Sequence, residues 1–567
     1  MLSSNSSSKR RREEEVEVSK KIRGSQEEVF SSDDSDDNEA LGKEDEEDSD
    51  DEGVEIDNPK AVPVMLYEMA EQLLDGGDEE GTVKAVAALE KAKEILFHLH
   101  PDVKTMFDKA REKMLAGNMK GKVPPGSSEV TASRLNCRYL LCLVSTMLAR
   151  IASVRNLHES NEKTVLLLRE ALLFYPRSIE ANYLLSRALR PMASDAPLLE
   201  EVEQHLKKAS SFVATGDVEE LQKSKRVQTS AREALSLLLL QEGKVEEAYK
   251  YLKATGYTWR LAKDVLSYRL QSSTSELGVD SDAAKTYVQA VDNAVPARAV
   301  EHLRHAFRPE APFWREHEYD LTCNASRRVG YFSYKYPFRE RKAVNSVEQV
   351  IDVLLRQVRK LYPAVEEEAT VAEWWVHSRP HTSGHQLHFD SDETRIADGG
   401  TPQHPICSCI LYLEEDGTIG GPTLVTDQTL QGGMATQGWM CFPKMGRLVA
   451  FDATMLHGVI PGRGPNPDPS KRRLTFMVGF WRKIDAVDRG EGRIGPGQPF
   501  PSSGTALAWP KELAPTLHLP DNEDKAVAVQ PLHLARIWEP IDSFKGGSSL
   551  LLGSIKLPDY KTIFQGI

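Results

Sequence analysis

The sequence predicts a multidomain α plus β protein, with an N-terminal α-helical array followed by an antiparallel β-sandwich or jelly roll. Between residues 58 and 270, apolar residues recur every three or four positions, as in amphipathic helices. Beyond Val371 the period changes to two, in short β-rich segments that turn sequences separate. At 567 residues, the chain is also too long for a single hydrophobic core.

Residues 1–57 form a charged tail that we expect to be disordered, because the segment has almost no aromatic residues. Residues 33–57 hold fifteen Asp and Glu residues against Lys43, so the tail accounts for most of the net charge of −14. The remainder is nearly neutral and shows no basic face typical of nucleic-acid binding. Basic clusters within residues 9–23 fit either a bipartite nuclear localisation signal or a solvated run of charges.

Residues 58–270 are predicted to form a helical, repeat-like domain. Segments such as Lys163–Pro176 and Lys244–Tyr257 have helical spacing and end at Pro or Gly. Their small and aromatic residues resemble degenerate tetratricopeptide repeats, which stack helix pairs into a surface for partner proteins. No clean period is visible, so an unspecialised helical bundle is the alternative.

The remainder of the chain divides into three predicted parts. Residues 271–305 are interpreted as a linker and a helix, and residues 306–485 as the β domain. Within the latter, Asn345–Pro363 has a capping residue and a continuous apolar stripe, which predicts a helix packed on a sheet. Residues 486–567 are a C-terminal extension to which we assign no role.

Three residues of the β domain have the pattern of a metal site. His388 and Asp390 are separated by one residue in the strand-like segment His385–Glu393, so both side chains are expected on one face. His457 follows in a later strand-like segment. Two imidazoles and one carboxylate can hold non-haem Fe(II) and leave adjacent positions open for a chelating oxoacid and dioxygen.

An H-x-D triplet alone is weakly specific. His100, Pro101 and Asp102 repeat the spacing in the helical domain, where we interpret them as the end of a helix. His388 and Asp390 are preferred as metal ligands because the residues that follow them have the expected order and lie in strand-like segments.

Arg473 is the candidate for binding the oxoacid. Strand alternation in Arg472–Trp481 places Arg473 and Thr475 on one face. A guanidinium group can hold a carboxylate through two hydrogen bonds, and the threonine hydroxyl can add a third. This chemistry suits the distal carboxylate of 2-oxoglutarate.

The stretch from Trp374 to Trp481 resembles the Fe(II)/2-oxoglutarate-dependent dioxygenase superfamily, and most of all its prolyl-4-hydroxylase-like branch. The matching motifs are HFD at His388–Asp390, SCILYLEE at Ser408–Glu415, GGPTL at Gly420–Leu424, LHGV at Leu456–Val459 and RLT at Arg473–Thr475. The resemblance implies a double-stranded β-helix (jelly-roll) core, Fe(II) bound by the triad, and 2-oxoglutarate and dioxygen as cosubstrates. It also implies that Tyr412 assists Arg473 at the distal carboxylate.

The chain departs from this family in two places. The loop between His457 and Arg473 is long, which a surface hairpin can absorb. A tyrosine that prolyl hydroxylases often place before the H-x-D strand is missing, and Trp374, Trp375 or His377 stands near its position.

The alternative metal site is a zinc site formed by His377, His381 and His385. At their four-residue spacing, these histidines would share one face of a helix. Pro380 and Gly384 make a helix improbable there. We therefore expect His381 and His385 at the mouth of the site or next to its ligands.

The sequence thus predicts a dioxygenase that hydroxylates, or demethylates through hydroxylation, a substrate presented at the mouth of the jelly roll. The helical region suggests a protein substrate or docking partner. The alternative is a helical-repeat scaffold protein whose jelly roll is non-catalytic or acts as a sensor. The six cysteines show no paired framework, and no secretory signal or membrane-length apolar run is present. We expect an intracellular protein, nuclear or cytoplasmic, with Cys407 and Cys409 as buried apolar residues.

Overall fold

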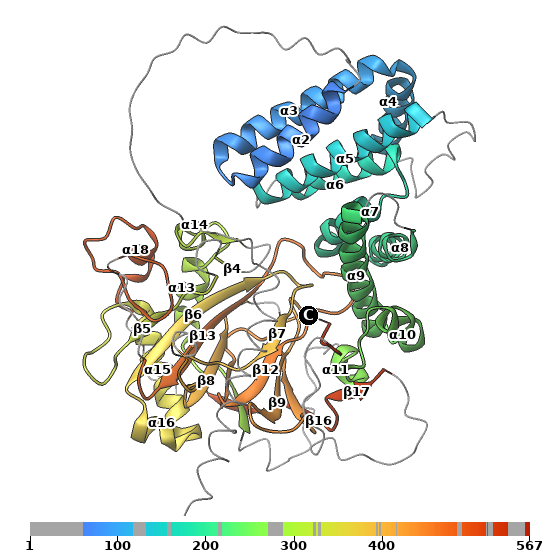
Figure 1. Ribbon diagram of the computed structural model, residues 1–567. Helices are drawn as coiled ribbons and strands as arrows, with labels where there is room; N and C mark the ends of the chain where they lie inside the picture. Colours follow the sequence, from blue (N-terminus) through green and yellow to red (C-terminus); the bar gives the residue numbers. More distant parts are fainter. Residues whose placement is uncertain are drawn as a thin grey trace, which may run out of the picture. The chain divides into compact units, whose positions relative to one another are not determined.

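The computed structural model contains both α-helices and β-sheets, as the sequence predicts (Figure 1). It describes residues 61–116, 132–155, 160–213, 218–269, 287–320, 325–326, 330–392, 395, 399–414, 417–484, 490, 492–517, 519, 526–541 and 562–566. The charged tail and its basic clusters lie outside these residues, so the nuclear signal stays a prediction. The described residues fall into two compact units, and we describe each separately.

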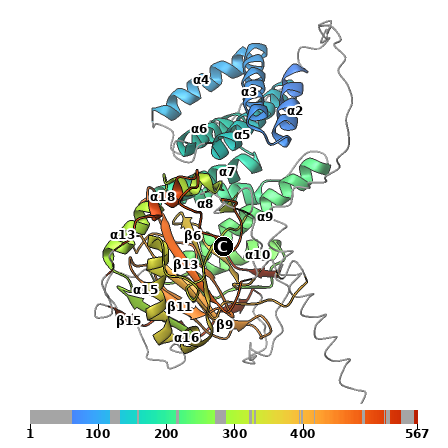
Figure 2. The same cartoon turned by 90° about the vertical axis from the view of Figure 1, so that its left-hand side faces the viewer.

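The helical unit is drawn from residues 20–188 and 204–228. Its main helices are α2 (Val62–Asp75), α3 (Glu79–Leu99), α4 (Pro101–Leu115), α5 (Ala132–Arg155), α6 (Ser160–Phe174) and α7 (Ile179–Leu189). Helix α2 packs against α3, and α5 against α6 (Figure 2). The buried carboxylate of Glu170 on α6 accepts hydrogen bonds from Lys93 Nζ on α3 at 3.0 Å and Arg111 Nε on α4 at 2.7 Å. This cluster ties three helices together.

The predicted tetratricopeptide character of this unit stays a prediction, since its helices differ in length from 11 to 24 residues. His100 ends α3, and Pro101 begins α4. The second H-x-D triplet is therefore a junction between helices, as predicted. None of the helices among the described residues is both long and apolar enough to cross a membrane.

The sheet unit is drawn from residues 189–203 and 229–567, and the division falls inside helices α8 (Ala196–Ser211) and α9 (Val218–Gln241). Its other helices are η1 (Arg190–Met192), α10 (Val245–Ala254), α11 (Lys263–Leu266), α13 (Ala297–Ala306), α14 (Pro312–Glu316), α15 (Ser346–Leu361), α16 (Pro363–Glu368) and α18 (Trp509–Leu513). Residues 229–269 were predicted as part of the helical domain, but they belong to this compact unit.

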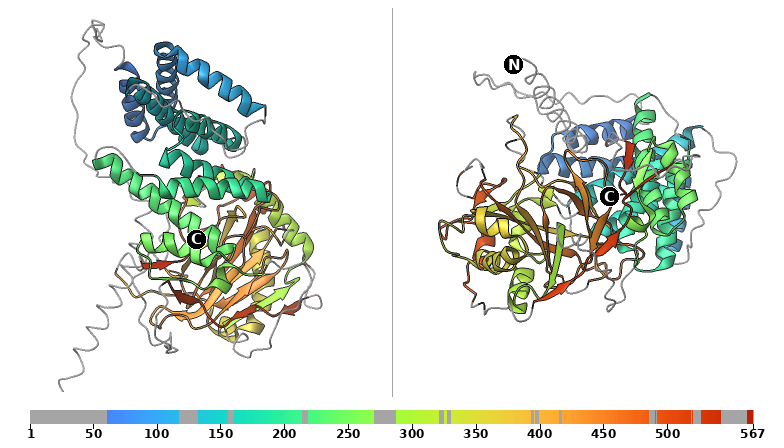
Figure 3. Two further views of the ribbon diagram at one scale, coloured as in Figure 1. Left: turned by 90° about the vertical axis from the view of Figure 1, so that its right-hand side faces the viewer. Right: turned by 90° about the horizontal axis from the view of Figure 1, so that it is seen from below.

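Two sheets form the centre of the unit. The larger has eight strands in the order β14-β5-β6-β13-β8-β11-β2-β15, and the smaller has five in the order β16-β10-β9-β12-β7. The large-sheet strands are β14 (Gln498–Pro499), β5 (Tyr334–Tyr336), β6 (Val371–Arg379), β13 (Arg473–Trp481), β8 (Cys407–Tyr412), β11 (Leu448–Asp452), β2 (Val288–Asp292) and β15 (Val527–Val529). The small-sheet strands are β16 (Leu532–Leu534), β10 (Gly438–Cys441), β9 (Thr423–Thr429), β12 (Met455–Val459) and β7 (His385–His388). Val425 and Trp439 of the small sheet pack with Ile410 and Phe451 of the large one in a buried cluster, so the sheets face each other (Figure 3).

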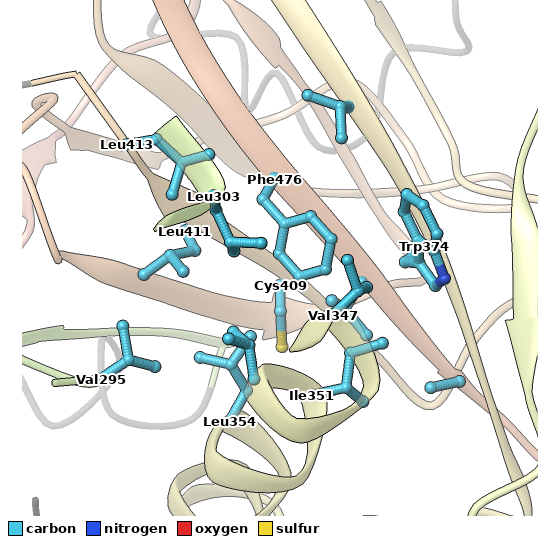
Figure 4. Packing of buried hydrophobic residues seen from close by; sticks show 14 of the residues in the cluster. Val295, Leu303, Val347, Ile351, Leu354, Trp374, Cys409, Leu411, Leu413 and Phe476 are labelled. Atoms are coloured by element: carbon cyan, nitrogen blue, oxygen red, sulfur yellow. The ribbon is translucent and has the colours of Figure 1, made fainter. Parts of the chain in front are cut away.

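Helix α15 covers the other face of the large sheet. The side chain of Asn345 accepts a hydrogen bond from Glu348 N at 2.9 Å, which confirms the predicted helix start. Val347 and Ile351 on α15 belong to one buried cluster with Trp374 and Phe476 on the sheet (Figure 4). Cys407 and Cys409 are buried in the same cluster, as predicted.

Strand β13 shows how the alternation of residues builds the site. Its residues Leu474 and Phe476 belong to the cluster under α15, whereas Arg473, Thr475 and Met477 line a cavity on the opposite face. One face of β13 thus packs in the hydrophobic core, and the other face lines the cavity of the candidate site.

Segments outside the predicted β domain complete the sheets. Residues 271–305 were expected to hold a linker and a helix. Helix α13 lies at the end of this range, but Val288–Asp292 is strand β2, paired antiparallel with β11. In the C-terminal extension, β15 pairs with β2 and β16 with β10. Two further strands of the extension, β17 (Trp538–Pro540) and β18 (Ile563–Phe564), flank β1 (Trp259–Leu261) in a separate three-stranded sheet. Only β3 (Tyr319–Asp320) and β4 (Ala325–Ser326) form a separate pair among the described strands.

Candidate metal centre

His388, Asp390 and His457 come together as the sequence predicts. His388 ends β7, and His457 lies opposite it in the antiparallel pairing of β12 with β7. Asp390 follows two residues after His388, just beyond the strand. Its Oδ1 atom lies 3.5 Å from Nε2 of each histidine. The ligand atoms of all three lie within 4.8 Å of one another, so the group could hold a metal ion.

Backbone carbonyls orient both imidazoles. His388 Nδ1 lies 2.8 Å from Gln386 O, and His457 Nδ1 lies 3.0 Å from Met455 O. In each ring, Nδ1–H is therefore the donor to a carbonyl, and Nε2 is the nitrogen that faces Asp390 and that a metal would bind. Fixing the tautomer in this way is what a metal-ligating histidine requires.

Asp390 is held as a carboxylate. Ser408 Oγ donates to its Oδ2 atom at 2.6 Å, which leaves Oδ1 to face the two histidines. Burial alone would raise the pKa of Asp390, but the charge of His457 and hydrogen bonds from both histidines hold it well below its ordinary value. The anionic form is the one that binds a metal.

Replacement of Ser408 by alanine is expected to lower metal affinity about 10- to 100-fold, since a residue that orients a ligating carboxylate usually contributes that much. Equilibrium titration with Ni(II) or anaerobic Fe(II) measures the change. Ser408→Thr keeps the hydroxyl and serves as the control. Equal affinities of the alanine variant and the wild type would show that Ser408 does not orient Asp390.

A cavity of about 40 Å³ lies beside the three residues. His388, Asp390 and His457 line it together with Arg473, Thr475 and residues of β6, β8 and β9. Arg473 is only 2% exposed, and among the described residues no carboxylate pairs with it. Its Nη2 donates to Thr423 Oγ1 at 3.0 Å, and its Nε has no hydrogen-bond partner. A buried cation with an orphaned donor at a cavity wall is poised to bind an anion.

Gly420 makes room for this arginine. Its φ of +79° suits glycine, and a Cβ atom there would lie 2.5 Å from Arg473 Cδ. Part of the GGPTL segment thus has a steric reason to contain glycine.

Thr475 and Tyr412 are cross-strand partners on β13 and β8, but only Thr475 reaches the cavity. Thr475 lines the cavity beside Arg473. Tyr412 is not among the lining residues, because its hydroxyl bonds Thr423 Oγ1 at 2.8 Å and donates to Cys441 O at 3.1 Å. The Arg473 guanidinium lies 5.1 Å from the centre of the Tyr412 ring, and this cation–π contact stabilises the buried charge of Arg473. A direct contact between Tyr412 and the oxoacid stays a prediction.

The rival zinc site does not form. His377 lies on β6 and His385 on β7 instead of on one helix, and within the described residues only the His388 group gathers three metal ligands. His381 Nδ1 accepts from Gly420 N at 3.1 Å, so this ring supports the glycine beside Arg473. The His385 ring stacks on His388 with centroids 4.4 Å apart, next to a ligand as expected.

Trp374, Trp375 and His377 were the alternatives for the position of the missing tyrosine, and the structure shows which of them line the cavity. Trp374 points into the core under α15, while Trp375 and His377 line the cavity. The Tyr319 hydroxyl lies 3.1 Å from His377 Nδ1. Burial first, and then the nearby charge of Arg379, hold the pKa of His377 well below its ordinary value, so the ring is neutral.

Gln565, near the C-terminus, holds the strand that carries His388. Strand β7 is at the edge of its sheet, and Gln565 Oε1 accepts a hydrogen bond from the buried Leu387 N at 2.9 Å. The extension to which the sequence assigned no role therefore satisfies a backbone donor next to a metal ligand.

Replacement of Gln565 by alanine is expected to destabilise the fold by about 1 kcal/mol and to weaken metal binding several-fold, because Leu387 N loses its partner. Thermal unfolding and Ni(II) titration measure the two effects. Gln565→Glu keeps an acceptor and should retain most of the affinity. Unchanged metal affinity in the alanine variant would refute a positioning role.

Sequence reasoning missed Ser408 and Thr423 as partners of the site, and also Gln565 and Arg379. Ser408 and Thr423 do stand in the SCILYLEE and GGPTL motifs, so their motifs gave a usable signal. Gln565 and Arg379 have no local signal, since their contacts depend on the folded chain.

No protein-family model matches the chain, and no curated protein matches it. A prolyl-4-hydroxylase structure from Pseudomonas putida aligns over 39% of this chain and 100% of its own, with 16% identity and a TM-score of 0.23. HygX from Streptomyces hygroscopicus, with nickel and 2-oxoglutarate bound, aligns over 37% of this chain and 92% of its own, with 14% identity and a TM-score of 0.19. A de novo designed helical repeat protein aligns over 35% of this chain and 80% of its own, with 20% identity and a TM-score of 0.15. These similarities are too weak to identify the chain.

Proposed function

We propose that the chain is a non-haem Fe(II)- and 2-oxoglutarate-dependent dioxygenase that hydroxylates a protein substrate. One observation carries the proposal. The triad of His388, Asp390 and His457 shares a cavity with the buried guanidinium of Arg473, which has no carboxylate partner among the described residues.

The donor set narrows the choice of metal. Two histidines and one carboxylate suit non-haem Fe(II) with open positions, but catalytic zinc also uses two histidines and a carboxylate. Arg473 supports iron, because zinc hydrolysis has no need of a buried oxoacid site, whereas 2-oxoglutarate chemistry does. Fe(II) would bind through Nε2 of His388 and His457 and Oδ1 of Asp390.

The residues of the cavity would bind and orient the cosubstrate. Arg473 and Thr475 face the space beside the triad, and Thr423 fixes the guanidinium. The distal carboxylate of 2-oxoglutarate would pair with Arg473 through charge-assisted hydrogen bonds. When bound, Fe(II) supplies dioxygen activation, so that 2-oxoglutarate, O₂ and a substrate C–H bond give succinate, CO₂ and a C–OH product.

The order of the strands supports a double-stranded β-helix. The large sheet contains β6-β13-β8-β11, and the small sheet contains β10-β9-β12-β7. Consecutive strands thus alternate between the two sheets over much of residues 371–481, which is the interleaving that a jelly roll requires.

The choice of a protein substrate rests on the helical unit, since extended helical arrays present large surfaces for other proteins. A scaffold protein with a silent β domain is the alternative. The oriented imidazoles and the carboxylate that Ser408 holds favour a β domain that binds a metal over a non-catalytic one.

The test is production of succinate from 2-oxoglutarate in air with Fe(II) and ascorbate. Wild-type protein is expected to form succinate, and the double variant His388→Ala, Asp390→Ala is expected to form none. For the substrate, mass spectrometry of proteins captured by full-length Asp390→Ala should find an added oxygen atom after treatment with active enzyme. Succinate formation that persists in the double variant would refute the enzyme proposal.

A further inference from the structure

A second buried arginine lines the cavity. Arg379 on β6 lies directly opposite Arg473 on β13 in the antiparallel register, so both side chains project from the same face. Arg379 is 5% exposed, and its Nη1 donates to Gly384 O at 2.8 Å. Within the described residues no carboxylate pairs with it.

Arg379 remains a cation in this position. Burial lowers its pKa to about 10, and the charge of Arg473 acts in the same direction, but the group is still protonated at neutral pH. An unpaired buried cation is unfavourable, and an oxyanion with its own lone pairs is the partner that a guanidinium binds best.

Arg379 lies close to the histidines of the cavity, because His377 stands two residues before it on the same face of β6 and the Nη1 of Arg379 donates to Gly384 O, next to His385. Its charge acts on His377 and on His385, and the His385 ring stacks against the ligand His388. A group bound at Arg379 would therefore lie beside the metal centre.

The charges of the cavity leave Arg379 without a counterion. A divalent metal and Asp390 together carry one net positive charge, and Arg473 and Arg379 add two. The dianion 2-oxoglutarate neutralises two of the three. Strand β6 also carries the buried carboxylate of Glu373, but it accepts hydrogen bonds from Ser333 and Tyr331 and does not line the cavity. One positive charge remains for another ligand.

We propose that Arg379 binds an oxyanion of the primary substrate, a carboxylate or a phosphate, and so selects an acidic substrate for the site. This inference rests on the proposed function. It assigns Arg379 to the substrate and Arg473 to the cosubstrate.

The first experiment separates the two arginines. Dissociation constants for 2-oxoglutarate are measured by calorimetry on Ni(II)-loaded, full-length protein. Arg379→Gln is expected to change the constant less than about threefold, whereas Arg473→Gln should raise it at least about tenfold, because it removes a charged hydrogen-bonding partner. Equal weakening by both variants would overturn the proposal, since the two arginines would then share the cosubstrate.

The second experiment detects the substrate oxyanion directly. Acetate and inorganic phosphate are titrated separately, at constant ionic strength, into Ni(II)-loaded protein saturated with 2-oxoglutarate. Wild-type protein should bind one of them, with an affinity at least about tenfold higher than that of Arg379→Gln. Arg379→Lys keeps the charge and should bind with intermediate affinity. Tighter binding of acetate indicates a carboxylate substrate, and tighter binding of phosphate indicates a phosphorylated one.

The results distinguish this inference from the function on which it rests. If wild-type protein binds 2-oxoglutarate but neither acetate nor phosphate, or if Arg379→Gln binds them equally well, Arg379 is not a substrate site and the dioxygenase proposal stands. If the wild type fails to bind Ni(II) and 2-oxoglutarate, both proposals fail. Metal affinity and thermal unfolding of Arg379→Gln and Arg379→Lys show whether each variant is folded.

Discussion

Replacement of Asp390 or His388 by alanine is expected to abolish specific binding of a divalent metal. Wild-type protein should be stabilised by about 2.7 kcal/mol at a metal concentration one hundred times the dissociation constant. Either variant should lose this stabilisation, because two remaining ligands no longer form the facial set that the metal needs. Thermal unfolding with and without Ni(II), or with anaerobic Fe(II), measures the effect.

The chain contains a matched control for this prediction. His100→Ala disrupts the second H-x-D triplet, which lies between α3 and α4. This variant should retain the full metal-induced stabilisation. A similar stabilisation of Asp390→Ala and wild type would show that the metal binds elsewhere.

Replacement of Arg473 by glutamine is expected to weaken binding of 2-oxoglutarate by about 2–4 kcal/mol, which is roughly 30- to 700-fold in the dissociation constant. The physical reason is the loss of a charged donor that is buried at 2% exposure and that no carboxylate pairs with among the described residues. Metal affinity should be unchanged, since Arg473 is not a ligand. Calorimetric titration of the Ni(II)-loaded protein measures both.

Arg472 provides the control for Arg473. It lies next along the chain, but its Nε donates to Ser378 Oγ and its Nη2 to Ser378 O, both at 2.8 Å, outside the cavity. Arg472→Gln should bind 2-oxoglutarate as the wild type does. Equal losses in the two variants would indicate a general effect on β13 and would contradict a specific role for Arg473.

The order and face of residues in the sequence predicted which side chains lie together, and the roles of these residues in binding stay predictions. Period-two alternation placed Arg473 and Thr475 on one face of β13, and both line the cavity. The pairing of His457 with His388 depends on sheet register, but the resemblance to a known family supplied it. The predicted strand His385–Glu393 is shorter in the structure, where β7 ends at His388 and Asp390 is held instead by Ser408.

Other features could not be predicted because they depend on distant contacts. The bond from Leu387 N to Gln565 joins residues 178 positions apart. The position of Arg379 opposite Arg473 follows from the register of β6 and β13, and no local pattern in either strand encodes it. Strand β2 lies in a segment that was interpreted as a linker and a helix, since a five-residue strand at the flank of a sheet has little periodicity to detect.

The most direct measurement is the absorption spectrum of the protein under anaerobic conditions. Addition of Fe(II) and 2-oxoglutarate together is expected to produce a metal-to-ligand charge-transfer band, which requires the oxoacid to chelate iron in the site. Neither addition alone should produce it, and Asp390→Ala should lack it. Absence of the band in wild-type protein, or an equal band in Asp390→Ala, would contradict the assignment of His388, Asp390 and His457 as the iron site.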